Sequence, residues 1–462
     1  MKSNRSLSIT CAIQDCKKGD IIGLLEEAFP SSIFDKKHDV KADANGTSKT
    51  TRDRIWTPSN TLRTMVLTAA QKDKSLKNSV GLFYGIHQKH KETIEKEMIQ
   101  KVMEEQIMDS KLPRHVGKPK LYKVKLPKSL EKDISINTSA YSDARSRLPL
   151  ELVNDLFVES QISNLENNYS HWHGLKVYLA DGTYLQLQDA PKISETYTVQ
   201  EGKVAFPQAL LEVVVARGSG QIACFKMANR HTSELPLLYD MIDDLPVNAL
   251  LLADDLYNCY EIIAKFIRTK KHLIVPAKRH RIYTLIEKLG EGDEIVEIEM
   301  PRKRSKWQTN ENLEMAKTCR VRMMSFTSPD GNKYNLLTTI LDKSISKDEF
   351  QMMYLTRWDI EIGIREIKTI MDINVLRAKT PEMALKELTV GLATYNLIRK
   401  IIYDSTKGLS FSPKEDIVFK YNTNDQDLLI DKKGRLYNQW GTGRKAIERV
   451  NSKGGITETK AK

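Results

Sequence analysis

The apolar pattern of residues 175–278 restricts the fold of this chain more than any other feature. Residues 175–188 and 209–228 contain three alternating or apolar runs, and Arg217–Gly220 supplies a turn between the last two. This pattern predicts a meander of three strands. Helical and strand patterns then alternate, in the order 233–244, 248–255, 258–269 and 272–278. A meander followed by such alternation predicts a mixed α/β sheet and excludes a pure β-sandwich or helix bundle.

The segments on either side of this core predict three domains. Residues 1–150 are mainly helical by their apolar spacing over 17–108, with a Lys-rich linker at 36–54 and a basic, Pro-containing arm at 111–128. Residues 151–405 hold the sheet, a β-rich insertion at about 282–346, and two long helices at about 347–371 and 381–403. The remaining domain, residues 406–462, is a Gly/Lys-rich basic tail without a clear core pattern.

Charge is distributed unevenly over the 462 residues. The net charge is +12, with +10 in residues 1–150 and −7 in residues 151–250. Segregated Lys and Arg are typical of proteins that bind polyanions such as DNA, although a solvated charged surface is the more common explanation of charge alone. Acidic residues facing DNA would need divalent cations between them and the phosphates.

Cysteine usage and hydropathy indicate the compartment. Five cysteines, an odd number with scattered spacing, fit neither a disulfide framework nor a zinc site, so we expect a reducing compartment. The N-terminus has no signal-peptide core, and no 18-residue uncharged apolar stretch occurs. We therefore expect a soluble, cytoplasmic protein.

Asp181 is the first candidate catalytic residue. It follows an apolar strand pattern and precedes Gly182-Thr183, so we expect its carboxylate at the end of a strand, at a bend where the backbone allows close approach of a substrate. An ordinary turn Asp beside Gly is the alternative explanation of this motif.

Asp254 and Asp255 end an apolar run whose carboxyl end is a common position for ligands and metals in α/β sheets. The alternative is an N-cap for a helix that starts near Asn258, which suits Asp255 in particular. We assign Asp254 to the site because it continues the strand directly.

A polar helix face supplies the third group. Tyr354, Arg357, Glu361, Arg365 and Lys368 fall within an arc of about 80° if residues 347–371 are an α-helix. A solvated face with i,i+4 ion pairs is the alternative. A tyrosine in line with cations and one acid favours phosphate binding around a metal-binding carboxylate.

Three carboxylates from two strands and a helix suit phosphoryl transfer with two Mg²⁺ ions. Mg²⁺ prefers carboxylate oxygens, and two such ions activate an attacking hydroxyl and stabilise the leaving oxygen. His171 and His173 lack further His or Cys ligands nearby, so we interpret them as structural.

The same residues resemble a known family, the DDE transposases of bacterial insertion sequences, of the type named after insertion sequence four. Asp181-Gly182-Thr183 matches the D-G-T of the first strand, and Asp254 matches the acid after the fourth strand. The signature Y-x2-R-x3-E-x6-K is matched in full by Tyr354, Arg357, Glu361 and Lys368. Where the family has Arg-Gly-aromatic after the second acid, this chain has Asp255-Leu256-Tyr257, so the choice between Asp254 and Asp255 stays open.

The resemblance implies a ribonuclease-H-like catalytic domain in which Asp181, Asp254 and Glu361 hold two Mg²⁺ ions, for which Mn²⁺ is able to substitute. It also implies cut-and-paste transposition on double-stranded DNA, at terminal inverted repeats and a target, by a homodimer associated with the nucleoid. Tyr354, Arg357 and Lys368 would grip phosphates. Contacts from the insertion would come from its basic tip, at Arg302, Arg304 and Trp307, with Trp307 able to stack on a displaced base or to serve as a packing anchor.

Two other functions remain compatible with these residues. One is a transposase-derived DNA-binding protein without cleavage activity, and the other is a structure-selective resolvase on the same fold. Intact acids argue against the first, and the full four-residue signature argues against the second.

Overall fold

A computed structural model describes residues 21–30, 32–35, 55–110, 137–162, 171–199, 206–308, 315–327 and 333–406, with four short strands beyond them. Two units are distinguished, Ile9–Ser405 and a second made of Met1–Ser8 with Thr406–Lys462. The second contains the antiparallel pairs β11 (Leu429–Ile430) with β12 (Leu436–Tyr437) and β13 (Ile447–Val450) with β14 (Ile456–Thr459). The linker and the basic arm expected at 36–54 and 111–128 lie outside the described residues.

The first part of the larger unit is helical, as its apolar spacing predicts. Its helices are α2 (Ile21–Ala28), α3 (Ser32–Asp35), α4 (Pro58–Ala69), α5 (Leu76–Ser110), α7 (Thr138–Arg147) and α8 (Leu150–Glu159). At the start of α4, the Thr57 hydroxyl accepts a hydrogen bond from the Asn60 backbone at 3.1 Å, and Pro58 occupies the first turn. A capping Thr followed by Pro is a strong helix start, because Pro sacrifices no intrahelical hydrogen bond there.

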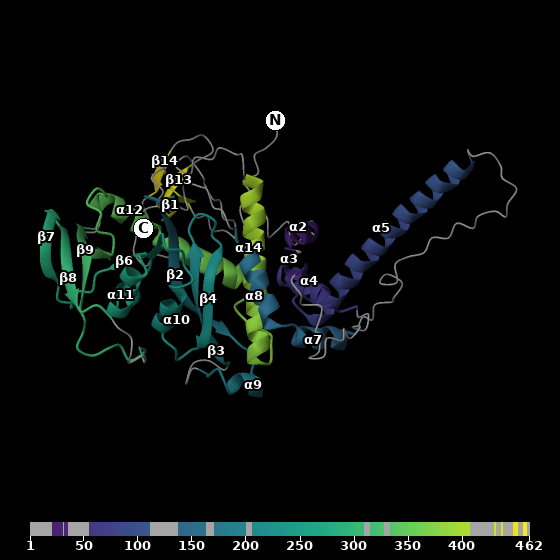
Figure 1. Cartoon of the computed structure of the whole chain (residues 1–462), viewed down its shortest axis with the longest axis horizontal. Coiled ribbons are helices and arrows are strands. Elements are labelled where there is room, and N and C mark those ends of the chain that lie inside the picture. The colour runs from purple at the N-terminus through teal and green to yellow at the C-terminus, as the bar shows by residue number, and fades with distance from the viewer. Residues whose placement is uncertain are drawn as a thin grey trace. The chain divides into compact units, whose positions relative to one another are not determined.

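A ten-stranded mixed sheet forms the centre of this unit (Figure 1). Its strand order is β4-β3-β2-β5-β6-β10-β9-β8-β7, and β1 pairs with β2 off this path. The three strands of the predicted meander, β2 (Leu175–Gln186), β3 (Gln208–Ala216) and β4 (Ile222–Asn229), are antiparallel neighbours, whereas β5 (Ala249–Leu252) and β6 (His272–Pro276) run parallel to β2. The sheet is thus mixed and accompanied by helices, which confirms the predicted α/β fold class.

The β-rich segment extends the same sheet. Its strands are β7 (Thr284–Gly290), β8 (Asp293–Glu299), β9 (Thr318–Thr327) and β10 (Lys333–Thr338), and β10 pairs antiparallel with β6. Arg322 on β9 ties this extension together, because its guanidinium donates to both carboxylate oxygens of Asp293 at 2.8 and 2.6 Å. It also donates to the Asp342 carbonyl at 2.6 Å, before the next helix begins.

Helices cover both faces of the sheet, and alternate residues of each strand join different cores. Leu250 and Leu252 of β5 belong to one apolar cluster together with Leu152 of α8 and Leu388 of α14 (Pro381–Thr406). Leu251 belongs to the other cluster, with residues of α10 (Glu234–Met241) and α11 (Tyr260–Arg268). Burial of both faces explains why β5 is apolar throughout.

Residues 347–370 are helical but do not form one α-helix, which corrects the expectation of a regular helix over 347–371. They divide into α12 (Lys347–Leu355), the 3₁₀ turn η2 (Thr356–Trp358), α13 (Asp359–Arg365) and the π-helical turn η3 (Glu366–Ile370). The Thr356 hydroxyl donates to the Met353 carbonyl at 2.7 Å, so a side chain competes with the backbone at the change of pitch. Single π turns recur at functional sites.

The remaining elements are β1 (His171–Trp172), the short helix α9 (Pro191–Ser194) and the 3₁₀ turn η1 (Asp255–Tyr257). Among the described helices, none combines the length and the apolarity that crossing a membrane requires.

Candidate active site

Asp181 lies in the middle of β2, where it pairs with Val213 of β3, and this corrects the expectation that it ends a strand. The alternating pattern simply continues through Thr183-Tyr184-Leu185, and β3 pairs with β2 as far as Gln186. The strand that ends near Asp181 is β5, the parallel neighbour of β2. The two strands pair only from Lys176–Ala249 to Leu179–Leu252. Asp181 and Asp254 each follow the last pair by two residues, so the register puts them at the same level.

Asp254 caps the turn η1, with its Oδ1 accepting a hydrogen bond from the Leu256 backbone at 2.9 Å. The capping role that was the alternative explanation for Asp255 is thus filled by Asp254, at the turn η1. Asp255 lies within η1 and is exposed, and the following helix α11 begins at Tyr260 rather than near Asn258. Capping and metal binding are compatible, because a carboxylate has lone pairs for more than one partner.

Glu361 comes from α13, which packs against β2. Its side chain is 48% exposed, and its Oε1 lies 3.8 Å from Nη2 of Arg357, whose side chain is 14% exposed. By alternation Asp181 shares a face of the sheet with Leu179, and Leu179 and Ile360 of α13 belong to one apolar cluster. Glu361 is thus carried by the helix that covers the face of Asp181.

The three acids act on one another electrostatically. Burial raises the pKa of the Asp181 carboxyl, and the charges of Asp254 and Glu361 raise it further. The Gly182 N–H, which donates to Asp181 Oδ1 at 2.9 Å, and the Arg357 guanidinium lower the same pKa. Asp254, Glu361 and Arg357 are therefore near enough to Asp181 to influence its charge, and a cation between the carboxylates would relieve their repulsion.

Tyr354 and Lys368 reach the two strands that lead to the acids. The Tyr354 hydroxyl donates to the Ala253 carbonyl at 3.3 Å, and burial raises the pKa of Tyr354 to about 12. Lys368 donates to the Thr183 hydroxyl at 3.1 Å. Glu366, next to Lys368 in the π turn, is buried, and its Oε2 accepts hydrogen bonds from Tyr395 at 3.0 Å and Arg399 at 2.6 Å, both on α14.

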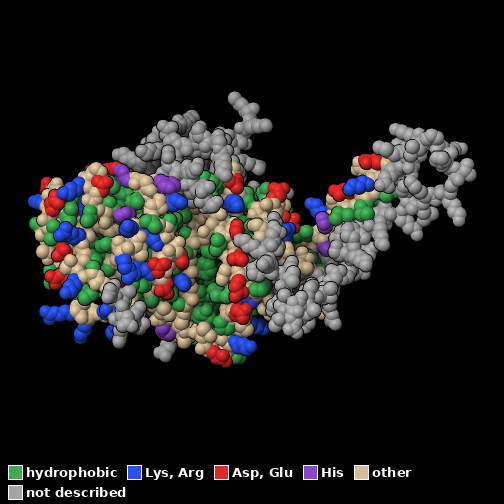
Figure 2. All heavy atoms as spheres, in the orientation of Figure 1, with side chains coloured by type: hydrophobic (Ala, Val, Ile, Leu, Met, Phe, Trp, Pro, Cys, Tyr) green, Lys and Arg blue, Asp and Glu red, His purple; other side chains and the backbone are tan. Residues whose placement is uncertain are grey.

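The tip residues of the insertion differ in their exposure. Arg302 and Arg304 are exposed, whereas Trp307 is partly buried, with its ring 5.5 Å from that of Tyr239. The indole of Trp307 thus serves as a packing anchor in this structure. Figure 2 shows Lys and Arg side chains over the end of the molecule that carries β7, β8 and β9, interspersed with acids. His173 pairs with Glu349 at 3.0 Å, as a structural histidine does.

The donor set suits a hard divalent cation, because the three converging side chains are all carboxylates. Among the described residues, however, no group of three or more His, Cys, Asp or Glu is already close enough to hold a metal ion. The 48% exposure of Glu361 indicates the side chain that has most room to move toward the other two.

Three further residues near the acids were not recognised in the sequence. Glu212 of β3, Glu234 of α10 and Tyr257 of η1 are joined by the Tyr257 hydroxyl, which lies 2.7 Å from Glu212 Oε1 and 3.2 Å from Glu234 Oε2. An acid inside the apolar run Leu210–Val215 was the available signal for Glu212, since an acid at a buried position needs a partner. No comparable signal marks Glu234, which occupies the ordinary acidic first turn of a helix.

Comparison with protein families gives a match that contains the residues of this site. Residues 172–397 match the family model described as transposase DDE domain, and they include all three acids and the complete four-residue signature. These residues are therefore similar to the DDE transposase domain, which agrees with the resemblance noted from the sequence.

Individual relatives agree with this assignment. The chain is 29% identical over 275 residues to the transposase InsG for insertion sequence element IS4 of Escherichia coli, covering 56% of this chain and 60% of that protein. It is 26% identical over 157 residues to the putative transposase InsZ of the same organism, covering 32% of this chain and 52% of the relative. The chain thus spans less than two thirds of these relatives.

A solved structure, the piggyBac transposase synaptic complex with hairpin DNA, also matches. The alignment covers 86% of this chain and 76% of the piggyBac transposase chain, with 10% identity and a TM-score of 0.37.

Proposed function

We propose that this protein is an insertion-sequence transposase, an enzyme that cleaves DNA at the ends of its element and joins the freed ends to a target. The observation that carries the proposal is the convergence of Asp181, Asp254 and Glu361 from β2, the end of β5 and α13. Carboxylates supplied by different elements of an α/β fold at the level where a parallel strand ends are suited to metal-assisted phosphoryl transfer.

The acids of the site and its basic and hydroxyl residues have different proposed roles. Asp181, Asp254 and Glu361 would hold two Mg²⁺ ions, or Mn²⁺ in their place, and the bound ions would supply an activated water or 3′-hydroxyl and stabilise the leaving oxygen. Arg357 is close enough to Glu361 to bind a phosphate beside it, and Tyr354 and Lys368 offer a hydroxyl next to Ala253 and an ammonium next to Thr183.

Double-stranded DNA is the proposed partner. The excess of positive charge in residues 1–150 suits recognition of the terminal inverted repeats, and Arg302 and Arg304 offer exposed cations on the insertion. We further propose that the protein acts as a homodimer on paired ends, in the nucleoid-associated cytoplasm. Trp307 contributes to DNA binding only if it leaves its contact with Tyr239.

The proposal is tested with amide variants of the acids, because an amide has nearly the size of a carboxylate without its charge. D181N, D254N and E361Q should fold and bind element ends while cleavage with Mg²⁺ falls by orders of magnitude, as measured on a labelled end-containing duplex. D255N, which changes an exposed acid in η1, is the matched control and should lose far less.

Two results would contradict the proposal. Parental cleavage rates in all of D181N, D254N and E361Q would exclude the metal site, and loss of cleavage in D255N but not D254N would transfer the role to Asp255. Specific end binding by a parental protein that never cuts, with Mg²⁺ or Mn²⁺, would favour the DNA-binding protein without cleavage activity.

A further inference from the structure

A buried hydrogen-bonded group of Glu212, Tyr257 and Glu234 lies directly behind the strand that carries Asp181. Glu212 is the register partner of Gly182, and both lie on the face of the sheet opposite to Asp181. Glu212 and Tyr257 are fully buried, and each of the three residues comes from a different element, namely β3, η1 and α10. The Tyr257 hydroxyl is the point where these three elements meet.

The Tyr257 hydroxyl lies between two carboxyl groups, and its single hydrogen cannot form a full hydrogen bond to both. A hydroxyl has a single hydrogen, so it donates to one carboxyl and accepts from the other, which must then be protonated. Burial raises the pKa of Glu212 well above its ordinary value, the hydrogen bond from Tyr257 lowers it, and the charges of Glu234, Asp181 and Asp254 raise it further. Its Oε2 has no hydrogen-bond partner among the described residues.

Glu234 is fixed against the strand itself. A Cβ built on Gly182 would lie 2.3 Å from Oε1 and 2.4 Å from the carboxyl carbon of Glu234, so this carboxylate occupies the space that any side chain at position 182 would need. Contact between Glu234 and the backbone next to Asp181 links α10 to the level of the acids.

Tyr257 lies at the end of the turn that Asp254 caps. Because η1 is only three residues long, a fixed Tyr257 ring restricts where the cap residue sits. We propose that Tyr257, held by Glu212 and Glu234, is a positioning residue that keeps Asp254 level with Asp181 for binding of divalent cations. This inference rests on the proposed function, since it assigns a support to the same site, and residues that orient metal ligands typically contribute about 10- to 100-fold to metal affinity.

The test measures binding of Mn²⁺ alone to the full-length protein without DNA, by the electron paramagnetic resonance signal of free Mn²⁺. Y257F should bind Mn²⁺ about tenfold more weakly than the parent. Y260F is the matched control, because Tyr260 is also buried, lies three residues further along, and donates its hydroxyl to the Ala316 carbonyl at 2.5 Å. Each variant loses the hydroxyl's contacts with two partners, Glu212 and Glu234 in Y257F and Ala316 and Cys319 in Y260F, but only Y257F touches the proposed support.

Two variants of Glu212 separate positioning from simple packing. E212L removes the acceptor of the Tyr257 hydroxyl and should weaken Mn²⁺ binding, whereas the amide oxygen of E212Q still accepts this hydrogen bond and should restore most of the affinity. Circular dichroism at the assay temperature establishes that each variant is folded, so that a general loss of stability does not imitate the effect.

Outcomes for this inference and for the proposed function are distinguishable, because D181N is measured in the same assay. Loss of Mn²⁺ binding in D181N with parental binding in Y257F, or equal weakening in Y257F and Y260F, would overturn the positioning role alone. Parental Mn²⁺ binding in D181N would overturn the proposed metal site and the positioning role with it.

Discussion

Lys368 donates a hydrogen bond to the Thr183 hydroxyl at 3.1 Å, which joins the π turn η3 to β2 two residues beyond Asp181. An ammonium group has three donors, so one contact to Thr183 leaves capacity for a phosphate. We expect K368A to weaken binding of element ends and to reduce the slope of log affinity against log salt by about one unit. Fluorescence anisotropy with a labelled end duplex over a range of salt concentrations measures this slope.

T183V is the control for that slope, because it removes the hydroxyl while leaving the charge of Lys368 in place. Its salt slope should match that of the parent. A parental slope in K368A as well would show that this lysine contacts no phosphate.

The second prediction concerns Gly182 of β2 and the stability of the protein. In G182A the new methyl group must displace the Glu234 side chain, so we expect the free energy of unfolding to fall by about 1–3 kcal/mol. The double variant G182A/E234A should lose less than the sum of the single losses, since the displaced atoms are gone. Urea denaturation of the four proteins gives this coupling.

G85A is the matched glycine control. Gly85 lies within α5 and a Cβ there would meet nothing within 4 Å, so its replacement should stabilise the protein by up to about 1 kcal/mol. Strict additivity of G182A and E234A would contradict the contact between these two residues.

The ion pair of Arg322 and Asp293 predicts where the β-rich extension is most sensitive. The Arg322 side chain is 2% exposed and satisfies three acceptors, so R322A should lower the free energy of unfolding by about 3–5 kcal/mol because it leaves Asp293 buried without its partner. R320A on the same strand should cost less than about 1 kcal/mol, because Arg320 is 64% exposed and lies 3.8 Å from Glu297. Similar losses in thermal denaturation of the two variants would contradict this difference.

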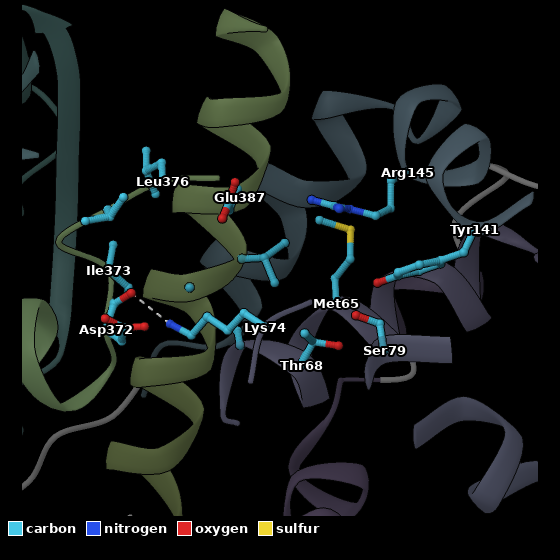
Figure 3. Close-up of a pocket in the computed structure, with 14 residues that line it drawn as sticks. Met65, Thr68, Lys74, Ser79, Tyr141, Arg145, Asp372, Ile373, Leu376 and Glu387 are labelled. Atoms are coloured by element: carbon cyan, nitrogen blue, oxygen red, sulfur yellow. Dashed lines mark hydrogen bonds between the residues drawn. The ribbon is translucent and has the colours of Figure 1, made fainter. Parts of the chain in front are cut away.

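Lys74 predicts a dependence of stability on pH. It lines a cavity of about 60 Å³ together with residues of α4, α7 and α14 (Figure 3). Its ammonium donates to the Met371 carbonyl and, at 3.0 Å, to the Asp372 carbonyl. Burial lowers the pKa of Lys74 to about 8, opposed by the charges of Asp372 and Glu387 and assisted by Arg377.

Between pH 8 and about 10.5 the unfolded chain therefore binds more protons at Lys74 than the folded chain does, and this residue makes stability rise with pH. This increase in the free energy of unfolding is lost as the pH falls from about 10.5 to about 8. K74M should remove this rise relative to the parent, as urea midpoints at several pH values would show. K72M, at an exposed neighbouring lysine, should keep the parental profile, and parallel profiles for the parent and K74M would contradict the lowered pKa.

The amino-acid sequence by itself determined the kinds and order of the elements in the sheet and the residue types at the site. Apolar periodicity is a local property, so the strands around Asp181 and Leu252 and the helices before residue 110 could be predicted from their own side chains. The signature Tyr354, Arg357, Glu361 and Lys368 could likewise be recognised, because its spacing is set within one helical segment.

Only the tertiary structure decided how these pieces meet. The register of β2 with β5, which brings Asp254 level with Asp181, depends on packing between segments 73 positions apart and not on either segment alone. The change of helical pitch at Thr356 and the capping of η1 by Asp254 depend on which hydrogen-bond partners the fold leaves available.

Tyr257 illustrates the physical reason most clearly. Its neighbours in sequence show only an aromatic residue after two acids, whereas its partners Glu212 and Glu234 come from elements 45 and 23 residues away. A buried hydroxyl takes whichever polar groups the sheet and helices bring to it, so its role is a property of the assembled fold rather than of the local sequence.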